Sequence, residues 1–166
     1  MQHMKNAGMP EAEFNALREK MNAFIYDELI PMEKEQGLTP ETCFSREQLQ
    51  EIWERSYELG IYGCNLPTEF GGLGLSISQL CILKADATRS NAALYGCVLG
   101  ENGGPMRIGY ILNQATEGQL EEFFIPTAQG KRAGCFALTE PQAGSDATRI
   151  QTRAVQDGDD YILNGH

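Results

Sequence analysis

Apolar residues recur at intervals of three and four over residues 11–30, which is the spacing of a helix with one buried face. This stripe consists of Phe14, Leu17, Met21, Phe24, Ile25 and Leu29. Pro10 suits the first turn of such a helix. Pro31 lacks a backbone N–H, so we expect it to end the helix or kink it.

Further helices are predicted by capping signals that stand before apolar runs. Ser45 and Gln48 have the spacing of a capping box, and Leu49, Ile52 and Trp53 follow as the apolar face. Gly60 is expected to stop that helix. Similar patterns predict helices at about 76–89, 92–100 and 106–112 and, after a second capping box, at 116–130. The glycine-rich run "LPTEFGGLGL" (66–75) predicts an ordered loop; no G-K-S/T follows it, so it is not a phosphate loop.

The periodicity changes after residue 131. The runs "RAGCFAL" (132–138), "RIQTRAV" (149–155) and "YILNG" (161–165) read as strands, and "QDGDD" reads as a hairpin turn. We therefore expect a mainly α chain: an all-α helical bundle at 1–130, followed by the first strands of an incomplete β domain at 131–166. Because three strands do not close a sheet around a core of their own, the sequence is interpreted as a truncated fragment.

Composition narrows the classes of function. The chain has 166 residues, 42% of them apolar, which is enough for a real core. Its 23 acidic and 13 basic residues give a net charge of −10, which disfavours nucleic acids and anionic membranes as partners. No apolar run reaches the roughly 18 residues of a membrane helix, and no secretory signal is seen. Five scattered cysteines suggest reduced thiols and a cytoplasmic protein.

Histidine chemistry and metal binding are not expected. The two histidines, His3 and His166, lie at the two ends of the chain, which argues against a histidine triad or a zinc site. We expect no metal ligands. Chemistry is instead expected from a bound cofactor, from carboxylates, or from groups outside this chain. Cys97 and Cys135 are interpreted as buried small apolar side chains.

The segment "LTEPQAGSD" (138–146) has more polar and hinge residues than a surface turn requires. The Thr139 hydroxyl can donate and accept hydrogen bonds, Gly144 allows close approach of a ligand, and Ser145 suits an anion nest. Glu140 and Asp146 are expected to brace the loop through backbone N–H groups. From the residues alone, a wide β-connection with Asx-type turns explains the segment equally well.

The run "ALTEPQAGSDA" resembles the flavin-loop signature of the acyl-CoA dehydrogenase family, and "TRAVQDGDDYILNG" continues the family pattern in order. "LPTEFGGLGL" and "ATEGQLEEFFIPTAQG" resemble segments of the family's helical N-terminal domain, so the resemblance covers nearly the whole chain. One departure is Gln142, which stands where many members have glycine.

The resemblance implies FAD as the cofactor and an acyl-CoA as the substrate. The implied FAD-binding residues are Phe136, Ala137, Leu138, Thr139, Gly144 and Ser145, with Ser145 also near the acyl-CoA. The segment "NAALYGCVLGENGGP" resembles the helix that bounds the acyl pocket in the family, where Gly96, Cys97 and Gly100 would leave room for an acyl group. The family's catalytic base is usually a glutamate of the C-terminal domain. We therefore assign no catalytic residue here and expect the fragment to be inactive.

The implied reaction is the α,β-dehydrogenation of an acyl-CoA thioester to an enoyl-CoA in fatty acid metabolism, by an oxidoreductase. An electron-transferring flavoprotein is the implied electron acceptor, and the full-length protein is expected to be a homo-oligomer. Two alternatives stay open: an acyl-CoA oxidase or flavin monooxygenase on the same scaffold, or a flavin-free helical interaction module. Neither acyl chain length nor branching follows from the sequence.

Overall fold

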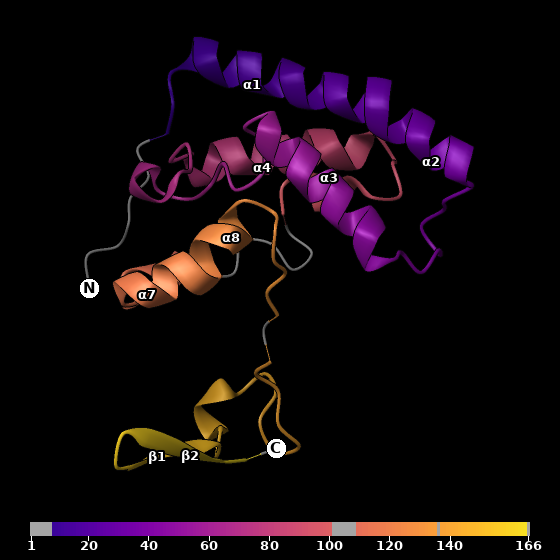
Figure 1. Ribbon diagram of the computed structural model, residues 1–166. Helices are drawn as coiled ribbons and strands as arrows, with labels where there is room; N and C mark the ends of the chain where they lie inside the picture. Colours follow the sequence, from indigo (N-terminus) through magenta and orange to yellow (C-terminus); the bar gives the residue numbers. More distant parts are fainter. Residues whose placement is uncertain (1–7, 101–108, 136, 166) are drawn as a thin grey trace. The chain divides into compact units, whose positions relative to one another are not determined.

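The structure is a computed structural model that describes residues 8–100, 109–135 and 137–165 (Figure 1). The chain separates into two compact units, Met1–Gly134 and Cys135–His166. The first unit is helical and the second contains a two-stranded hairpin. The expected fold class, mainly α with a short β part at the C-terminal end, is confirmed. No helix in the described ranges is long and apolar enough to cross a membrane.

The first rod of the helical unit continues past Pro31. It consists of α1 (Glu11–Ala23), a π-helical stretch η1 (Phe24–Leu29) and α2 (Ile30–Gln36), and runs along the top of Figure 1. In the π stretch the Ile30 N–H bonds to the Ile25 carbonyl, five residues back. Pro31 occupies the first turn of α2, where its missing N–H is tolerated. The rod ends at Gly37, at φ 65°, so of the two outcomes expected at Pro31, an end or a kink, the end is wrong.

The longer helices that follow begin at capping boxes. Ser45 and Gln48 cap α3 (Arg46–Glu58), and Ser76 and Gln79 cap α4 (Ile77–Arg89). Each serine hydroxyl accepts the N–H of its glutamine, and each glutamine side chain accepts the N–H of its serine. Gly60, at φ 72°, follows the end of α3. These predicted boundaries of α3 and α4 are confirmed.

Shorter elements complete the helical unit. They are η2 (Thr68–Phe70), α5 (Tyr95–Val98), α6 (Gly109–Leu112), α7 (Glu117–Gln119), the π stretch η4 (Leu120–Phe124) and α8 (Ile125–Ala128). Thr116 and Gln119 form the predicted capping box before α7. Of the helix expected at 92–100, only the single turn of α5 forms. Of the helix expected at 106–112, residues 106–108 lie outside the described residues.

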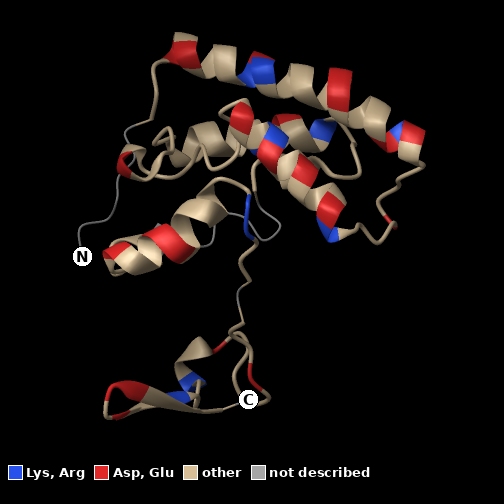
Figure 2. Ribbon diagram, in the orientation of Figure 1, with Lys and Arg blue, Asp and Glu red and all other residues tan. Residues whose placement is uncertain are grey.

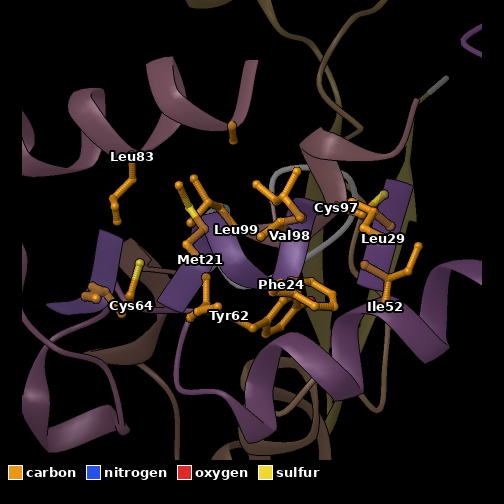
Figure 3. Close-up of a cluster of buried hydrophobic side chains, with 14 of the residues drawn as sticks. Met21, Phe24, Leu29, Ile52, Tyr62, Cys64, Leu83, Cys97, Val98 and Leu99 are labelled. Atoms are coloured by element: carbon orange, nitrogen blue, oxygen red, sulfur yellow. The ribbon is translucent and has the colours of Figure 1, made fainter. Parts of the chain in front are cut away.

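One hydrophobic cluster holds the helical unit together (Figure 3). Met21, Leu83 and Val98 are fully buried in it, and they come from α1, α4 and α5. The predicted core face of the first helix and the core position of Trp53 are confirmed. Burial raises the pKa of the Cys64 thiol to about 12, so this thiol stays protonated at neutral pH. Cys97 is buried as expected.

The loop at 66–75 is ordered because its backbone folds back on itself. The Gly74 N–H donates to the Leu66 carbonyl at 2.9 Å, and the Leu73 N–H donates to the Cys64 carbonyl at 3.0 Å. Gly71 and Gly74 adopt positive φ angles of 82° and 60°. A Cβ at Gly72 would lie 1.9 Å from the Leu66 carbonyl oxygen, which no real contact allows. The loop therefore depends on glycine for close backbone approach as well as for conformation.

The second unit contains η5 (Ala147–Arg149) and the antiparallel strands β1 (Arg153–Asp157) and β2 (Asp160–Asn164). Val155 pairs with Ile162, and Gly158 forms the predicted hairpin turn at φ 64°. The strand expected at 149–155 begins only at Arg153, because Asp146 caps a 3₁₀ turn before it. Every residue of β1 and β2 is exposed.

The strand expected at 132–138 does not form in the described part of this run. A strand needs a partner for its backbone hydrogen bonds, and in the described residues the sheet holds β1 and β2 alone. Cys135 is exposed here, so the prediction that it is buried is wrong. Gly134, just before it, is half-buried, and Ala137, two residues after it, is exposed.

Replacing Gly72 by alanine is expected to destabilise the helical unit by about 2 kcal/mol or more, because the added Cβ displaces the Leu66 backbone. Urea denaturation followed by circular dichroism measures the loss. The matched control is Gly118→Ala in α7, where a Cβ meets nothing within 4 Å. That change should be neutral or stabilise by up to about 1 kcal/mol. Equal stability of the two variants would contradict the close approach at Gly72.

Candidate functional site

The candidate site is the loop at 137–146, which is closed by a tight turn. The Glu140 N–H donates to the Ala143 carbonyl at 2.9 Å, and the Ala143 N–H donates to the Glu140 carbonyl at 3.1 Å. Pro141 and Gln142 form the tip between them, which suits the fixed φ of proline. The turn separates Thr139 on one side from Gly144 and Ser145 on the other.

Glu140 braces this turn from inside. Its side chain is 7% exposed and accepts the N–H groups of Gln151 at 2.8 Å and Thr152 at 2.9 Å. The Thr152 hydroxyl and the Gln142 side-chain amide also donate to it. A buried carboxylate is costly unless donors surround it, and here they do. The carboxylate thereby ties the turn to the residues just before the hairpin, and the expectation that Glu140 braces the loop through backbone N–H groups is confirmed.

Asp146 performs a similar task at the other end of the loop. Its Oδ1 accepts the Thr148 N–H at 3.2 Å and also bonds to the Thr148 hydroxyl. This contact caps η5, the 3₁₀ turn that leads toward the hairpin. The expectation that Asp146 braces the loop through backbone N–H groups is confirmed.

Gly165 lets the end of the hairpin approach the same brace. A Cβ at Gly165 would lie 2.1 Å from the Thr152 Oγ1, the hydroxyl that donates to Glu140. Gly165, which follows β2, therefore packs directly against Thr152, a residue that donates to Glu140. This close approach accounts for glycine in the Asn-Gly pair that ends the predicted strand.

The residues expected to bind a cofactor lie on the exposed side of the loop. Ala137, Leu138, Thr139, Gly144 and Ser145 are all exposed, and Leu138 retains 42% of its accessible surface. A Cβ at Gly144 would meet nothing within 4 Å, so the backbone there is open to a ligand. Phe136 lies outside the described residues. No described residue hydrogen-bonds the Thr139 or Ser145 hydroxyl.

This arrangement fits a flavin dinucleotide. The carboxylates of Glu140 and Asp146 accept hydrogen bonds within the loop. The Thr139 hydroxyl and exposed backbone precede the turn, and Gly144 and Ser145 follow it. A planar ring with carbonyl and N–H groups suits the first set, and a phosphate suits the second. Acidic and basic side chains are interspersed within each of the two units (Figure 2). In the described ranges, no group of three His, Cys, Asp or Glu residues is placed to hold a metal ion.

The segment at 91–100 presents a different surface from the one expected for an acyl pocket. Cys97 is 1% exposed and Gly100 is buried at φ 77°, so neither offers open space in the described unit. Tyr95 is 37% exposed and Gly96 is half-buried. The side of α5 that a ligand can reach therefore holds Tyr95 and Gly96. A larger residue at Gly100 would strain the backbone and is a poor test of the pocket.

Sequence reasoning missed Glu33, a buried acid of α2. Its two carboxylate oxygens accept the N–H groups of Ala93 and Leu94, just before α5. The signal was present: Glu33 lies four residues after Leu29, in line with the apolar stripe of the first helix. An acid that continues a buried stripe indicates a carboxylate with internal donors.

Hollows also occur among the described residues of the helical unit, and the two described next contain no residue predicted to bind the cofactor. A groove of about 630 Å³ lies between the first rod and α3, where Glu28 and Arg55 form a salt bridge at 2.8 Å. This hydrogen-bonded pair lowers the pKa of Glu28. A smaller, mostly apolar hollow of about 340 Å³ is lined by residues of the 62–71 loop and by α8.

Known proteins are similar to this chain in sequence and in fold. The model of the acyl-CoA dehydrogenase N-terminal domain matches residues 11–131. The rat mitochondrial long-chain specific acyl-CoA dehydrogenase is 31% identical over 93% of this chain, and the rat short-chain specific enzyme is 31% identical over 95%. The chain spans 34% and 36% of those two proteins. An acyl-CoA dehydrogenase from Bacillus anthracis in complex with FAD is 25% identical, with a TM-score of 0.64 over 94% of this chain and 26% of that one.

Replacing Glu140 by glutamine is expected to open the loop, because an amide supplies one acceptor oxygen and sets an NH₂ group against backbone donors. The lost charged hydrogen bonds correspond to about 2–3 kcal/mol of local stability. Amide hydrogen exchange at Gln151 and Thr152 should therefore accelerate about 30-fold or more. Asp159→Asn, which removes one charge from the exposed hairpin turn, is the control and should leave both rates unchanged. Unchanged exchange in the Glu140 variant would contradict the brace.

Proposed function

Because the chain belongs to the acyl-CoA dehydrogenase family, we propose that its parent protein oxidises an acyl-CoA thioester to the α,β-unsaturated enoyl-CoA with FAD. The chain contributes part of the flavin site and part of the acyl-CoA site. The observation that carries the proposal is the loop at 137–146, which buries Glu140 as a brace and leaves its predicted contact residues exposed.

Each side of the loop has a separate binding task. Backbone atoms of Ala137 and Leu138 and the hydroxyl of Thr139 bind the edge of the flavin ring. Gly144 and Ser145 bind the pyrophosphate through open backbone and a hydroxyl, and Ser145 also borders the acyl-CoA. Phe136 is proposed as a ring contact from the resemblance alone. FAD, when bound, supplies the hydride acceptor, and the loop supplies position and polarisation.

The base that removes the α-proton is proposed to lie outside this chain. In the described loop, the carboxylates of Glu140 and Asp146 accept internal hydrogen bonds and are engaged in bracing. Residues 1–130 are proposed as the family's helical N-terminal domain and 131–166 as the start of its β domain. The 166-residue chain alone is expected to show no turnover.

The proposed substrate is an acyl-CoA without a selected chain length, and the proposed partners follow the family resemblance. Long-chain and short-chain enzymes of the rat are equally similar to this chain, so identity does not select a chain length. We propose that the segment at 91–100 forms one wall of the acyl pocket. An electron-transferring flavoprotein is proposed as electron acceptor and a homo-oligomer as the assembly. A cytoplasmic location stays a prediction, since both rat relatives are named mitochondrial.

The first test uses the complete protein that contains these 166 residues, purified and titrated with acyl-CoA thioesters of increasing length without oxygen. We expect the visible absorption of oxidised flavin, and we expect it to bleach with one class of chain length. Reoxidation by an electron-transferring flavoprotein supports the dehydrogenase. Rapid reoxidation by oxygen with release of peroxide indicates an oxidase instead. A colourless protein that FAD does not reconstitute would exclude the proposal and favour an interaction module.

A second test addresses the ring-side contact. Thr139→Val keeps the shape of the side chain and removes the hydroxyl, so FAD affinity should fall about fivefold, as for one lost hydrogen bond of about 1 kcal/mol. Titration of the apoprotein with FAD measures the dissociation constant. Thr68→Val in the helical unit makes the same chemical change at another exposed threonine and should leave the affinity unchanged. Equal affinities of both variants would remove Thr139 from the site.

A further inference from the structure

The single-turn helix α5 is held at both ends by buried side chains from other helices. At its start, Glu33 of α2 accepts the N–H of Ala93 through Oε2 at 2.9 Å and the N–H of Leu94 through Oε1 at 2.8 Å. At its end, the Ser56 hydroxyl of α3 donates to the Val98 carbonyl at 2.5 Å. Glu33 is 6% exposed and Ser56 is fully buried.

These contacts replace the local signals that α5 lacks. A helix of one turn is unstable by itself, because nucleation is costly and few hydrogen bonds form. Leu94 stands at the N-cap position and provides no side-chain cap. The side chains of Glu33 and Ser56 satisfy backbone groups at the two ends of α5 that its own sequence leaves open. We call this pair of contacts the α5 clamp.

The clamp determines where the accessible side of α5 lies. Cys97 and Val98 face the core cluster, near Leu29 in Figure 3, while Tyr95 and Gly96 remain partly accessible. Close-packed cores transmit small shifts. Loss of the Glu33 contact should therefore move the whole of α5, its accessible residues Tyr95 and Gly96 together with its buried residues Cys97 and Val98. No other described side chain hydrogen-bonds the N–H of Ala93 or Leu94.

We propose that Glu33 and Ser56 are positioning residues that set the acyl-chain selectivity of the enzyme by fixing α5 against the rod and α3. This inference rests on the proposed function, in which the segment at 91–100 is a wall of the acyl pocket. Neither residue touches the acyl group. Both act through the backbone of α5, which carries Tyr95 and Gly96 toward the ligand.

The first experiment tests the clamp in the complete protein without any added cofactor. Glu33→Gln keeps the size of the side chain but sets an NH₂ group against a backbone donor, so hydrogen exchange at Ala93 and Leu94 should accelerate about tenfold or more. Glu35→Gln, an exposed neighbour on the same helix, is the matched control and should leave both rates unchanged. Unchanged exchange in Glu33→Gln would overturn the proposal.

The second experiment compares the same variants in the complete, FAD-loaded enzyme with a short and a long acyl-CoA. We expect Glu33→Gln to change the ratio of the two KM values about fivefold or more, with kcat for the short substrate nearly unchanged, as for lost ground-state binding. A purely structural defect would lower the active fraction and leave that ratio unchanged. An unchanged ratio in an active enzyme would overturn the proposal.

Ser56→Ala supplies an independent variant, because it removes the donor at the other end of α5 with little change in volume. It should shift the KM ratio in the same direction as Glu33→Gln, and an opposite or absent shift would count against the clamp. If the complete protein binds no FAD, the proposed function fails and the selectivity claim fails with it. The exchange rates at Ala93 and Leu94 separate that outcome from failure of the clamp itself.

Discussion

Buried carboxylates need hydrogen-bond donors, and this requirement organises the candidate site. In the described part of the second unit, Glu140 and Ala143 are the buried residues, and both hairpin strands are exposed along their whole length. The described residues of this unit therefore form no hydrophobic core of their own. The loop depends on the bonds from Gln151 and Thr152 to Glu140, which fix the turn to the two residues just before β1, eleven and twelve residues later. Without these donors the carboxylate would return to water and the turn would lose its anchor.

The same chemical solution occurs in the helical unit, with a different consequence. Glu33 also accepts two backbone N–H groups, but there a hydrophobic core already packs the helices. Glu33 therefore positions α5 more than it stabilises the unit as a whole, since α5 is a one-turn helix that lacks caps of its own. In each unit a buried carboxylate, Glu33 or Glu140, fixes the backbone next to accessible residues that have proposed binding roles. The conformation of these accessible residues therefore depends on buried polar contacts.

Local signals in the sequence predicted local structure well. The capping boxes at Ser45 and Thr116 and the turn at Gly158 depend on neighbouring residues, so a short window contains the whole cause. The predictions that were wrong depend on distant partners. Of the two outcomes expected at Pro31, the helix end is wrong, because the helix continues through the π-helical stretch into α2. The strand at 132–138 required a neighbouring strand that the described sheet does not have.

The distinction between local causes and distant partners also applies to the hydrogen-bonded carboxylates. The bracing roles of Glu140 and Asp146 were predictable because the pattern of the loop implies them, whereas Glu33 needed the packing of α2 against the segment before α5. A chain with a net charge of −10 does not attract the phosphates of FAD or CoA through its overall field. If the proposed function holds, the binding of FAD and CoA to this loop must therefore come from short-range donors that are already oriented. A rigid turn with open backbone at Gly144 and a hydroxyl at Ser145 meets that condition, and the buried brace makes it rigid.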